Sequence, residues 1–191
     1  MQRVIIESKT TNMKRVVLHH TCSQKGGKDY VLENAPFLAK NNAQNRKFQF
    51  LGEGYYLWEN DIEQAKYWGK VHYDNSFFIV EFEYDIEDKL LLDLNAREGQ
   101  RTLYKIIDTI QKEVGLNLKN WPLSKLLSFI YRSNINFIYK SIKVKDEFSS
   151  RRRQEIFKFT SVKDNFTYIG GVYFYFFRNK DDMNIISKNI V

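Results

Sequence analysis

The sequence predicts an α+β protein whose strands are mostly antiparallel. Three observations lead to this prediction: strand-like segments gather at both ends of the chain, helical patterns cluster in its middle, and aromatic residues make up 16% of the composition. Segregated strands and helices are typical of α+β folds, and abundant Tyr and Phe favour sheets. With 191 residues, 43% of them hydrophobic, and only two prolines, we expect one domain over residues 1–191.

Short segments rich in Val, Ile and aromatic residues predict the strands of the first half of the chain. They lie at residues 3–6, 14–20, 48–51, 55–58, 77–84 and 89–94. Within 77–84 the side chains alternate, so the even-numbered residues from Phe78 to Tyr84 should share one buried face. Polar, glycine-bearing turns separate these segments, as hairpin connections require.

Helical signals occupy the middle of the chain. Residues 60–61 provide a capping side chain for a helix that runs to about His72. The apolar spacing over 103–114 predicts an amphipathic helix, and Pro122 suits the first position of the next helix. Both fall within residues 97–140, which we interpret as a helical insert without a readable motif.

The last third begins with a strongly basic segment, residues 140–153. Strands are predicted at 155–159 and 167–177, followed by a polar tail from Arg178. The formal net charge of the whole chain is +7, which makes a polyanion such as nucleic acid a natural partner. The alternative is a solvated, lysine-rich surface.

A single cysteine, Cys22, excludes an internal disulfide framework and a cysteine-based zinc site, so we expect a cytoplasmic protein. No apolar run approaches the ~20 residues that span a membrane, and Glu7 interrupts any secretory signal core. We therefore expect no membrane partner. Delivery into another cell by a signal-free route stays open as an alternative.

Familiar phosphate and metal motifs are not satisfied. Gly26-Gly27-Lys28 lacks the spacing and the Ser or Thr of a P-loop. The glycines at 52 and 54 lack the third glycine and the βαβ context of a dinucleotide fingerprint. His19 and His20 are adjacent on a strand and point to opposite faces, so only one can face a pocket, and we expect no metal.

Four segments of the chain carry the more informative pattern. They are Leu18-His-His-Thr-Cys-Ser23, Gly52-Glu-Gly-Tyr-Tyr-Leu57, Glu63-Gln-Ala-Lys-Tyr-Trp68 and Gln154-Glu-Ile-Phe-Lys-Phe159. In order and spacing they resemble the His-Tyr-Glu branch of the ADP-ribosyltransferase superfamily, shared by diphtheria-toxin-like toxins and poly-ADP-ribose polymerases. Residues 78–94 are similar to a strand pair of small bacterial members. The resemblance implies an ADP-ribosyltransferase-like fold of split antiparallel sheets with flanking helices.

The resemblance also implies NAD as co-substrate and a role for each matching residue. It assigns NAD binding to His20, Thr21, Gly54, Tyr55, Tyr56 and Tyr67, and catalysis to Glu155, Tyr56 and His20. Two tyrosine rings would enclose the nicotinamide, and the imidazole would bind the adenosine ribose. The glutamate would bind the other ribose and stabilise the positive charge that develops as nicotinamide leaves.

Two departures from the family pattern bear on the acceptor. Thr21 stands where the polymerases usually have glycine, and Arg153 stands where arginine-modifying members have Gln or Glu. The second departure argues against arginine as the modified residue.

Basic residues just before the candidate catalytic glutamate suggest the acceptor. They are Lys143, Lys145, Arg151, Arg152 and Arg153, and they predict nucleic-acid binding, with RNA favoured over DNA. The overall prediction is a mono-ADP-ribosyltransferase resembling bacterial toxins of toxin–antitoxin, phage-defence or effector systems, restrained by an antitoxin or immunity protein. The alternatives are a protein acceptor, an NAD glycohydrolase, or a non-catalytic basic nucleic-acid-binding module.

Overall fold

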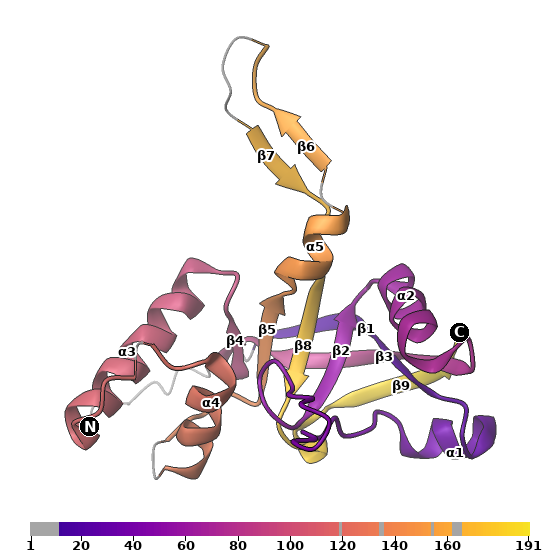
Figure 1. Ribbon diagram of the computed structural model, residues 1–191, viewed down its shortest axis with the longest axis horizontal. Coiled ribbons are helices and arrows are strands. Elements are labelled where there is room, and N and C mark those ends of the chain that lie inside the picture. The colour runs from indigo at the N-terminus through magenta and orange to yellow at the C-terminus, as the bar shows by residue number, and fades with distance from the viewer. Residues whose placement is uncertain (1–11, 119, 134–135, 154, 162–165) are drawn as a thin grey trace, which may run out of the picture.

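The computed structural model describes residues 12–118, 120–133, 136–153, 155–161 and 166–191 (Figure 1). The strands are β1 (Met13–Ser23), β2 (Tyr55–Glu59), β3 (Phe77–Glu87), β4 (Leu91–Asp93), β5 (Ser141–Lys145), β6 (Glu155–Lys158), β7 (Phe166–Ile169), β8 (Tyr173–Phe177) and β9 (Ile185–Ile190). The helices are α1 (Gly27–Asn34), α2 (Ile62–Tyr73), α3 (Arg97–Val114), α4 (Leu123–Arg132) and α5 (Glu147–Arg153).

The main sheet has the strand order β4-β5-β8-β2-β1-β3-β9, and β6 pairs with β7 in a separate two-stranded sheet. Pairing in the described strands is antiparallel except between β4 and β5, which run parallel. The predicted α+β class is therefore confirmed. The finer expectation of an ADP-ribosyltransferase-like arrangement stays a prediction.

Hydrophobic residues fill both faces of the main sheet. On β3, Val80, Phe82 and Tyr84 are fully buried on one face, as the alternation predicted, whereas Ile79 packs in the cluster on the other face. Burying one such large side chain contributes about 2–3 kcal/mol relative to leaving it in water. The two clusters hold the sheet between α1 on one side and the helices α2, α3 and α4 on the other.

Helix α2 begins and ends as its sequence suggests. The Asp61 side chain accepts a hydrogen bond of 2.9 Å from the backbone N–H of Gln64, which confirms the predicted cap. At the other end Asp74 has a φ of 46°, the left-handed conformation that terminates many helices. Gly69 lets the helix approach β3, because a side chain there would collide with the Phe77 ring.

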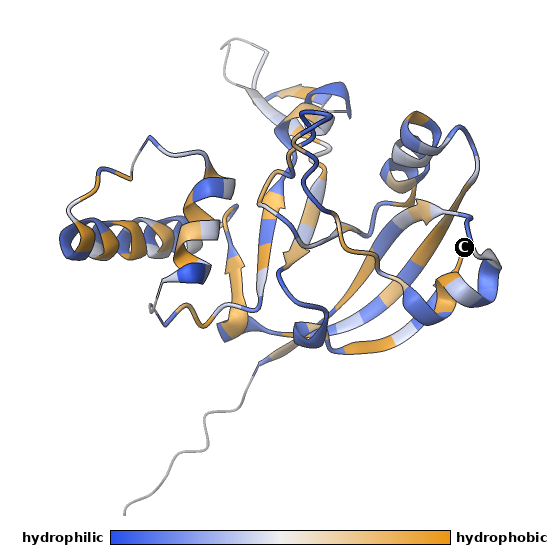
Figure 2. Cartoon of the chain, turned by 60° about the horizontal axis from the view of Figure 1, so that its bottom comes forward, coloured by the Kyte–Doolittle hydropathy of each residue, from blue (hydrophilic) through white to orange (hydrophobic). Residues whose placement is uncertain are grey.

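The predicted middle helices are present as α3 and α4, and Pro122 lies at the N-cap of α4, one position before its predicted place. Hydrophobic and hydrophilic stretches alternate along α3, and its buried residues are Ile107 and Ile110 (Figure 2). None of the described helices combines the length and the apolar character that a membrane crossing requires.

Two predicted strands and the predicted polar tail differ from the structure. Residues 48–51 form a turn-rich segment instead of a strand. The backbone N–H of Leu51 bonds to the Tyr56 hydroxyl rather than to a partner strand. The predicted strand 167–177 is divided into β7 and β8 at Gly170, whose φ of 95° breaks an extended chain. The tail after Arg178, predicted as polar, contains β9, which pairs with β3 because Ile185 and Ile190 pack on the sheet. The strand predicted at 3–6 lies outside the described residues.

Candidate functional site

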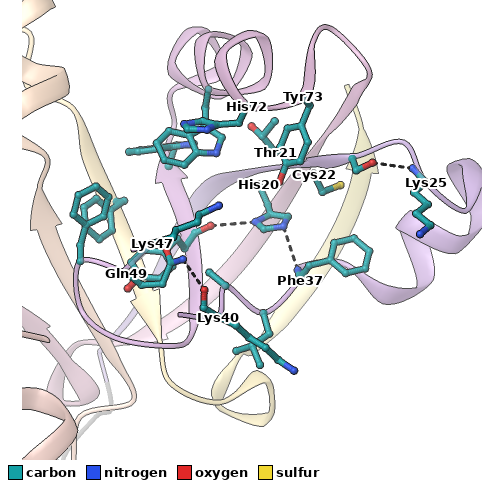
Figure 3. Close-up of a pocket in the computed structure, with 18 of the residues that line it drawn as sticks. His20, Thr21, Cys22, Lys25, Phe37, Lys40, Lys47, Gln49, His72 and Tyr73 are labelled. Atoms are coloured by element: carbon teal, nitrogen blue, oxygen red, sulfur yellow. Dashed lines mark hydrogen bonds between the residues drawn. The ribbon is translucent and has the colours of Figure 1, made fainter. Parts of the chain in front are cut away.

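A cavity of about 770 Å³, here called the first cavity, opens where β1 and β2 part (Figure 3). In the described chain β1 pairs with β2 at Leu18 and His19. The later residues of β1 stay paired with β3, but their other edge no longer pairs with β2, which leaves that edge open to a ligand. His20 to Ser23 line one wall, and α2 and the 37–50 segment line others. This volume lies within the roughly 300–1,000 Å³ of small-molecule sites.

Aromatic rings and ammonium groups dominate the lining of the first cavity. The rings nearest the sheet are Tyr56, Trp58, Trp68 and Phe174, and the ammonium groups belong to Lys25, Lys40 and Lys47. None of the lining residues, all from the described part of the chain, carries a carboxylate. This composition suits a flat, negatively charged ligand, because rings stack on heterocycles and ammonium groups attract phosphates.

His20 rather than His19 faces the first cavity, and its two ring nitrogens both bond to the backbone. The Nε2 atom accepts from the N–H of Phe37 at 3.1 Å, so it carries no proton. Nδ1 therefore carries the proton and donates to the carbonyl oxygen of Tyr56 at 3.1 Å. Burial lowers the pKa of His20 to about 4, which keeps the ring neutral at physiological pH.

His19 points to the opposite face of β1. Its Nε2 contacts the Glu81 carboxylate at 3.1 Å, and its buried Nδ1 has no partner among the described residues. Strand alternation thus separates the two histidines, as expected from their adjacency.

Tyr56 lines the first cavity with its ring, while its hydroxyl organises the glycine turn before β2. The hydroxyl donates to the carbonyl oxygen of Gly52 at 2.6 Å and accepts from the N–H of Leu51 at 2.9 Å. Burial raises the pKa of this phenol, so it stays protonated. A side chain at Gly54 would lie 2.6 Å from the carbonyl oxygen of Phe177, so only glycine fits between β2 and β8.

Other residues assigned by the resemblance take structural roles. Thr21 lines the first cavity, and its hydroxyl donates to the carbonyl oxygen of Ala65 at 2.8 Å, which ties β1 to α2. Gly54 and Tyr55 do not line the first cavity; Tyr55 packs against the cluster on the other face of the sheet because it alternates with Tyr56. Burial raises the pKa of Cys22 to about 11, so its thiol is not a thiolate nucleophile at neutral pH.

Helix α2 directs a different aromatic residue into the first cavity than the resemblance assigned. Trp68 and His72 lie one turn apart with their ring centroids 4.1 Å from each other, and both line the cavity. Tyr67 faces solvent with 43% of its surface exposed, and its hydroxyl accepts a hydrogen bond from Arg152. The two tyrosines assigned to the nicotinamide therefore do not face each other, because successive helix positions point about 100° apart.

Glu155 does not line the first cavity. It is exposed at the start of β6, opposite Ile169 in the hairpin formed by β6 and β7, and that hairpin projects from the sheet beyond α5 (Figure 1). The segment resembling a final strand is therefore neither the last strand nor a neighbour of β2. The neighbours of β2 are β1 and β8, and the residues of β8 from Tyr173 to Phe177 are all aromatic.

The predicted nucleic-acid-binding residues are largely occupied by local partners. Lys143 and Lys145 contact Glu59 and Glu147 at 2.6 and 3.3 Å, and Lys143 is mostly buried. Arg153 contacts Asp61 at 2.5 Å, and Arg152 contacts Tyr67. Of the five, Arg151 is exposed on α5 and forms no ion pair or hydrogen bond with another side chain in the described chain. The basic run thus fastens α5 and β5 to their neighbours rather than forming one free surface.

Sequence reasoning missed several residues that line the first cavity. Trp68 ends one of the quoted segments and Trp58 directly follows another, but strand and helix alternation, not motif matching, would have identified them. Lys47 ends a segment without a readable pattern, and Phe50 lies in the segment wrongly predicted as a strand, so only the tertiary structure brings them to the site. Among the described residues no group of three or more His, Cys, Asp or Glu side chains is placed to hold a metal ion.

Comparison of the chain with protein-family models, with curated proteins and with solved structures returned no match. The first cavity brings together a neutral buried imidazole, several aromatic rings and three ammonium groups. These groups suit a flat, anionic ligand, and a carboxylate acting on such a ligand would have to come from outside the described lining.

Proposed function

We propose that the first cavity binds NAD and that the chain is a mono-ADP-ribosyltransferase similar to small bacterial toxins. The observation that carries the proposal is that His20 and Tyr56, which the resemblance assigns to NAD, line one aromatic and cationic cavity. NAD has two flat heterocycles and a pyrophosphate. The rings of Trp58 and Trp68 offer stacking surfaces, and the lysine ammonium groups offer charge to the phosphates.

His20 suits a ribose in one specific way. Its unprotonated Nε2 is an acceptor, at present occupied by the N–H of Phe37. A ribose hydroxyl would replace that N–H when the segment around Phe37 shifts, and Nδ1 would keep its bond to Tyr56. The exchange preserves the number of hydrogen bonds on the imidazole, and the displaced N–H of Phe37 then needs a new acceptor from the ligand or from water.

Transfer requires a carboxylate at the reacting ribose. The bond from C1′ of that ribose to the nicotinamide nitrogen breaks, and nicotinamide leaves with the bonding electrons. The acceptor atom then bonds to C1′ and gives its proton to the carboxylate. In this proposal the carboxylate is Glu155, and the β6–β7 hairpin has to close towards α2 to bring it there. Arg153, two residues earlier, is already tied to the start of α2 by Asp61.

The acceptor in this proposal is a nucleic acid, with RNA favoured, and a protein antitoxin or immunity factor would restrain the enzyme in the cytoplasm. The net charge of +7 supports a polyanionic acceptor. A second candidate function is a nucleotide-binding module without catalysis. The observation that favours it is the absence of a carboxylate from the described lining of the first cavity.

The test combines NAD binding with product analysis. Calorimetric titration of the full chain with NAD should give saturable binding at one site, and incubation should release nicotinamide. Isotope-labelled NAD offered with total RNA, DNA or lysate protein identifies the acceptor. Binding without nicotinamide release would establish the non-catalytic alternative, release without label transfer would establish a glycohydrolase, and no binding at all would refute the proposal.

A further inference from the structure

A second cavity of about 520 Å³ lies between α4 and the segment of residues 41–53. That segment is the wall shared by the two cavities. Gln49 lines both, Phe48 lines the second cavity and Phe50 lines the first. Both phenylalanines are unusually exposed for their type, at 68% and 57%, so their rings are accessible to a ligand.

The second cavity combines cations with aromatic rings. Lys125 lies over the Trp121 ring, with its Nζ 3.9 Å from the ring centroid. Arg178 donates to the backbone carbonyl of Glu53 at 2.8 Å, and its guanidinium lies 5.6 Å from the Tyr131 ring. Rings and backbone atoms therefore position these cations, and their charge is left available.

The charge balance of the second cavity is positive. Lys125, Arg132 and Arg178 line it, and Glu53 is the one acid among its lining residues in the described chain. Within that part of the chain none of the three cations forms an ion pair. The predicted basic run differs, because Lys143, for example, is neutralised by Glu59.

We propose that the second cavity binds single-stranded nucleic acid, the acceptor of the proposed transferase. Single strands are held by cations that contact phosphates and by exposed rings on which bases stack. Phe48 and Trp121 supply the rings, and Lys125 and Arg132 supply phosphate contacts. A duplex does not present free base faces, so it cannot use the rings. This inference rests on the proposed function only for the identity of the reaction, not for the binding itself.

The shared wall explains why the acceptor would occupy this position. Gln49 lines both cavities, so the 48–50 segment lies between a strand in the second cavity and a nucleotide in the first. A nucleotide that crosses this wall therefore enters the proposed NAD site. The predicted acceptor site thus moves from the basic run, which contacts Glu59 and Asp61 at the end of β2, to the start of β2, beside α4.

The test measures oligonucleotide binding without NAD. Fluorescence anisotropy of labelled single-stranded RNA and DNA of one sequence, and of the duplex, is recorded over a range of salt concentrations. The matched pair is Phe48→Ala and Phe159→Ala, two rings that are each 68% exposed, of which Phe48 lines the second cavity and Phe159 lines neither cavity. Phe48→Ala should weaken single-strand binding by about 5- to 150-fold, the range of one lost base stack, and Phe159→Ala should leave it unchanged.

Lys125→Ala provides an electrostatic readout that does not depend on stacking. It should reduce the slope of log affinity against log salt concentration by about 0.7, the value for one lost phosphate contact on a single strand. Lys145→Ala, whose ammonium is paired with Glu147, should leave the slope unchanged. Tighter binding of RNA than DNA would identify the acceptor as RNA, and equal binding would support recognition through bases and phosphates alone.

The same variants separate this inference from the proposed function. If NAD titrations fail but Phe48→Ala and Lys125→Ala weaken oligonucleotide binding, the second cavity is the nucleic-acid site and the proposed enzyme activity is refuted. Preference for the duplex, unchanged binding in both variants, or loss of binding only in Arg151→Ala would overturn the inference.

Discussion

His20 and Tyr56 are joined by a hydrogen bond of 3.1 Å from the imidazole Nδ1 to the tyrosine carbonyl oxygen. This bond connects β1 to β2 at the point where the two strands part, and it holds the imidazole against the first cavity. Because the other nitrogen accepts from Phe37, the ring has one tautomer and stays neutral.

The buried imidazole should make folding stability depend on pH. The pKa of His20 falls to about 4 in the folded chain, below the 6.5 of an exposed histidine. As the pH falls, His20 therefore takes up a proton in the unfolded chain before it does so in the folded chain. The stabilising contribution of the neutral ring is fully present above about pH 6.5 and is lost between about pH 6.5 and pH 4. We expect wild type to lose about 2 kcal/mol more than His20→Gln between about pH 7 and pH 4.5, measured by urea unfolding. Equal losses of unfolding free energy in wild type and His20→Gln would contradict the lowered pKa of His20.

The adjacent aromatic residues Tyr67 and Trp68 of α2 should differ in their contribution to the affinity for NAD. Trp68 lines the first cavity, whereas Tyr67 faces solvent beside Arg152. Trp68→Ala should weaken NAD binding by about tenfold, because it removes a stacking surface worth roughly 0.5–1.5 kcal/mol as well as buried area. Tyr67→Ala is the matched control and should bind NAD as wild type does. A reversed order in calorimetry would restore Tyr67 to the role that the resemblance assigned.

Glu155 on the β6–β7 hairpin should contribute to the rate of turnover but not to the affinity for NAD. Glu155 is exposed on β6 and away from the lining of the first cavity, so Glu155→Gln should bind NAD normally and keep its thermal stability. If the hairpin closes during the reaction, the variant should lose at least about 100-fold in nicotinamide release, as general acid–base groups commonly do. Glu147→Gln, an exposed acid on α5, is the control. Unaltered release in Glu155→Gln would remove this residue from the mechanism.

Lys47 and His72 should be coupled electrostatically at the first cavity. The pKa of His72 is lowered, first by burial and second by the positive charge of Lys47. Lys47→Ala should therefore raise the pKa of His72 part of the way towards 6.5, since the effect of burial remains. Titration of the histidine ring protons by NMR measures the change directly. Lys40→Ala, which removes another lining ammonium group, should leave that pKa where it is; a pKa that moves in both variants would indicate a general charge effect.

Local rules accounted for much of the framework. The capped helix α2, the alternation on β3 and the amphipathic helix α3 all follow from side chains within a few residues of each other. The division between β7 and β8 was not foreseen, because a lone glycine is compatible with a strand until its φ is known. The strand β9 was also missed, since pairing with β3 depends on residues about a hundred positions away.

The sequence by itself determined the α+β class, the opposite directions of His19 and His20, and a glycine–aromatic motif at β2, because each depends on backbone geometry over a few residues. Only the tertiary structure decided which rings and charges share a cavity. It brought Lys47 and Trp68 to His20, sent Tyr67 and Glu155 elsewhere, and neutralised the basic run with Glu59 and Asp61. The physical reason is that ion pairs and cavity walls are formed by segments distant in sequence, whose approach is set by the packing of the sheet and not by local pattern.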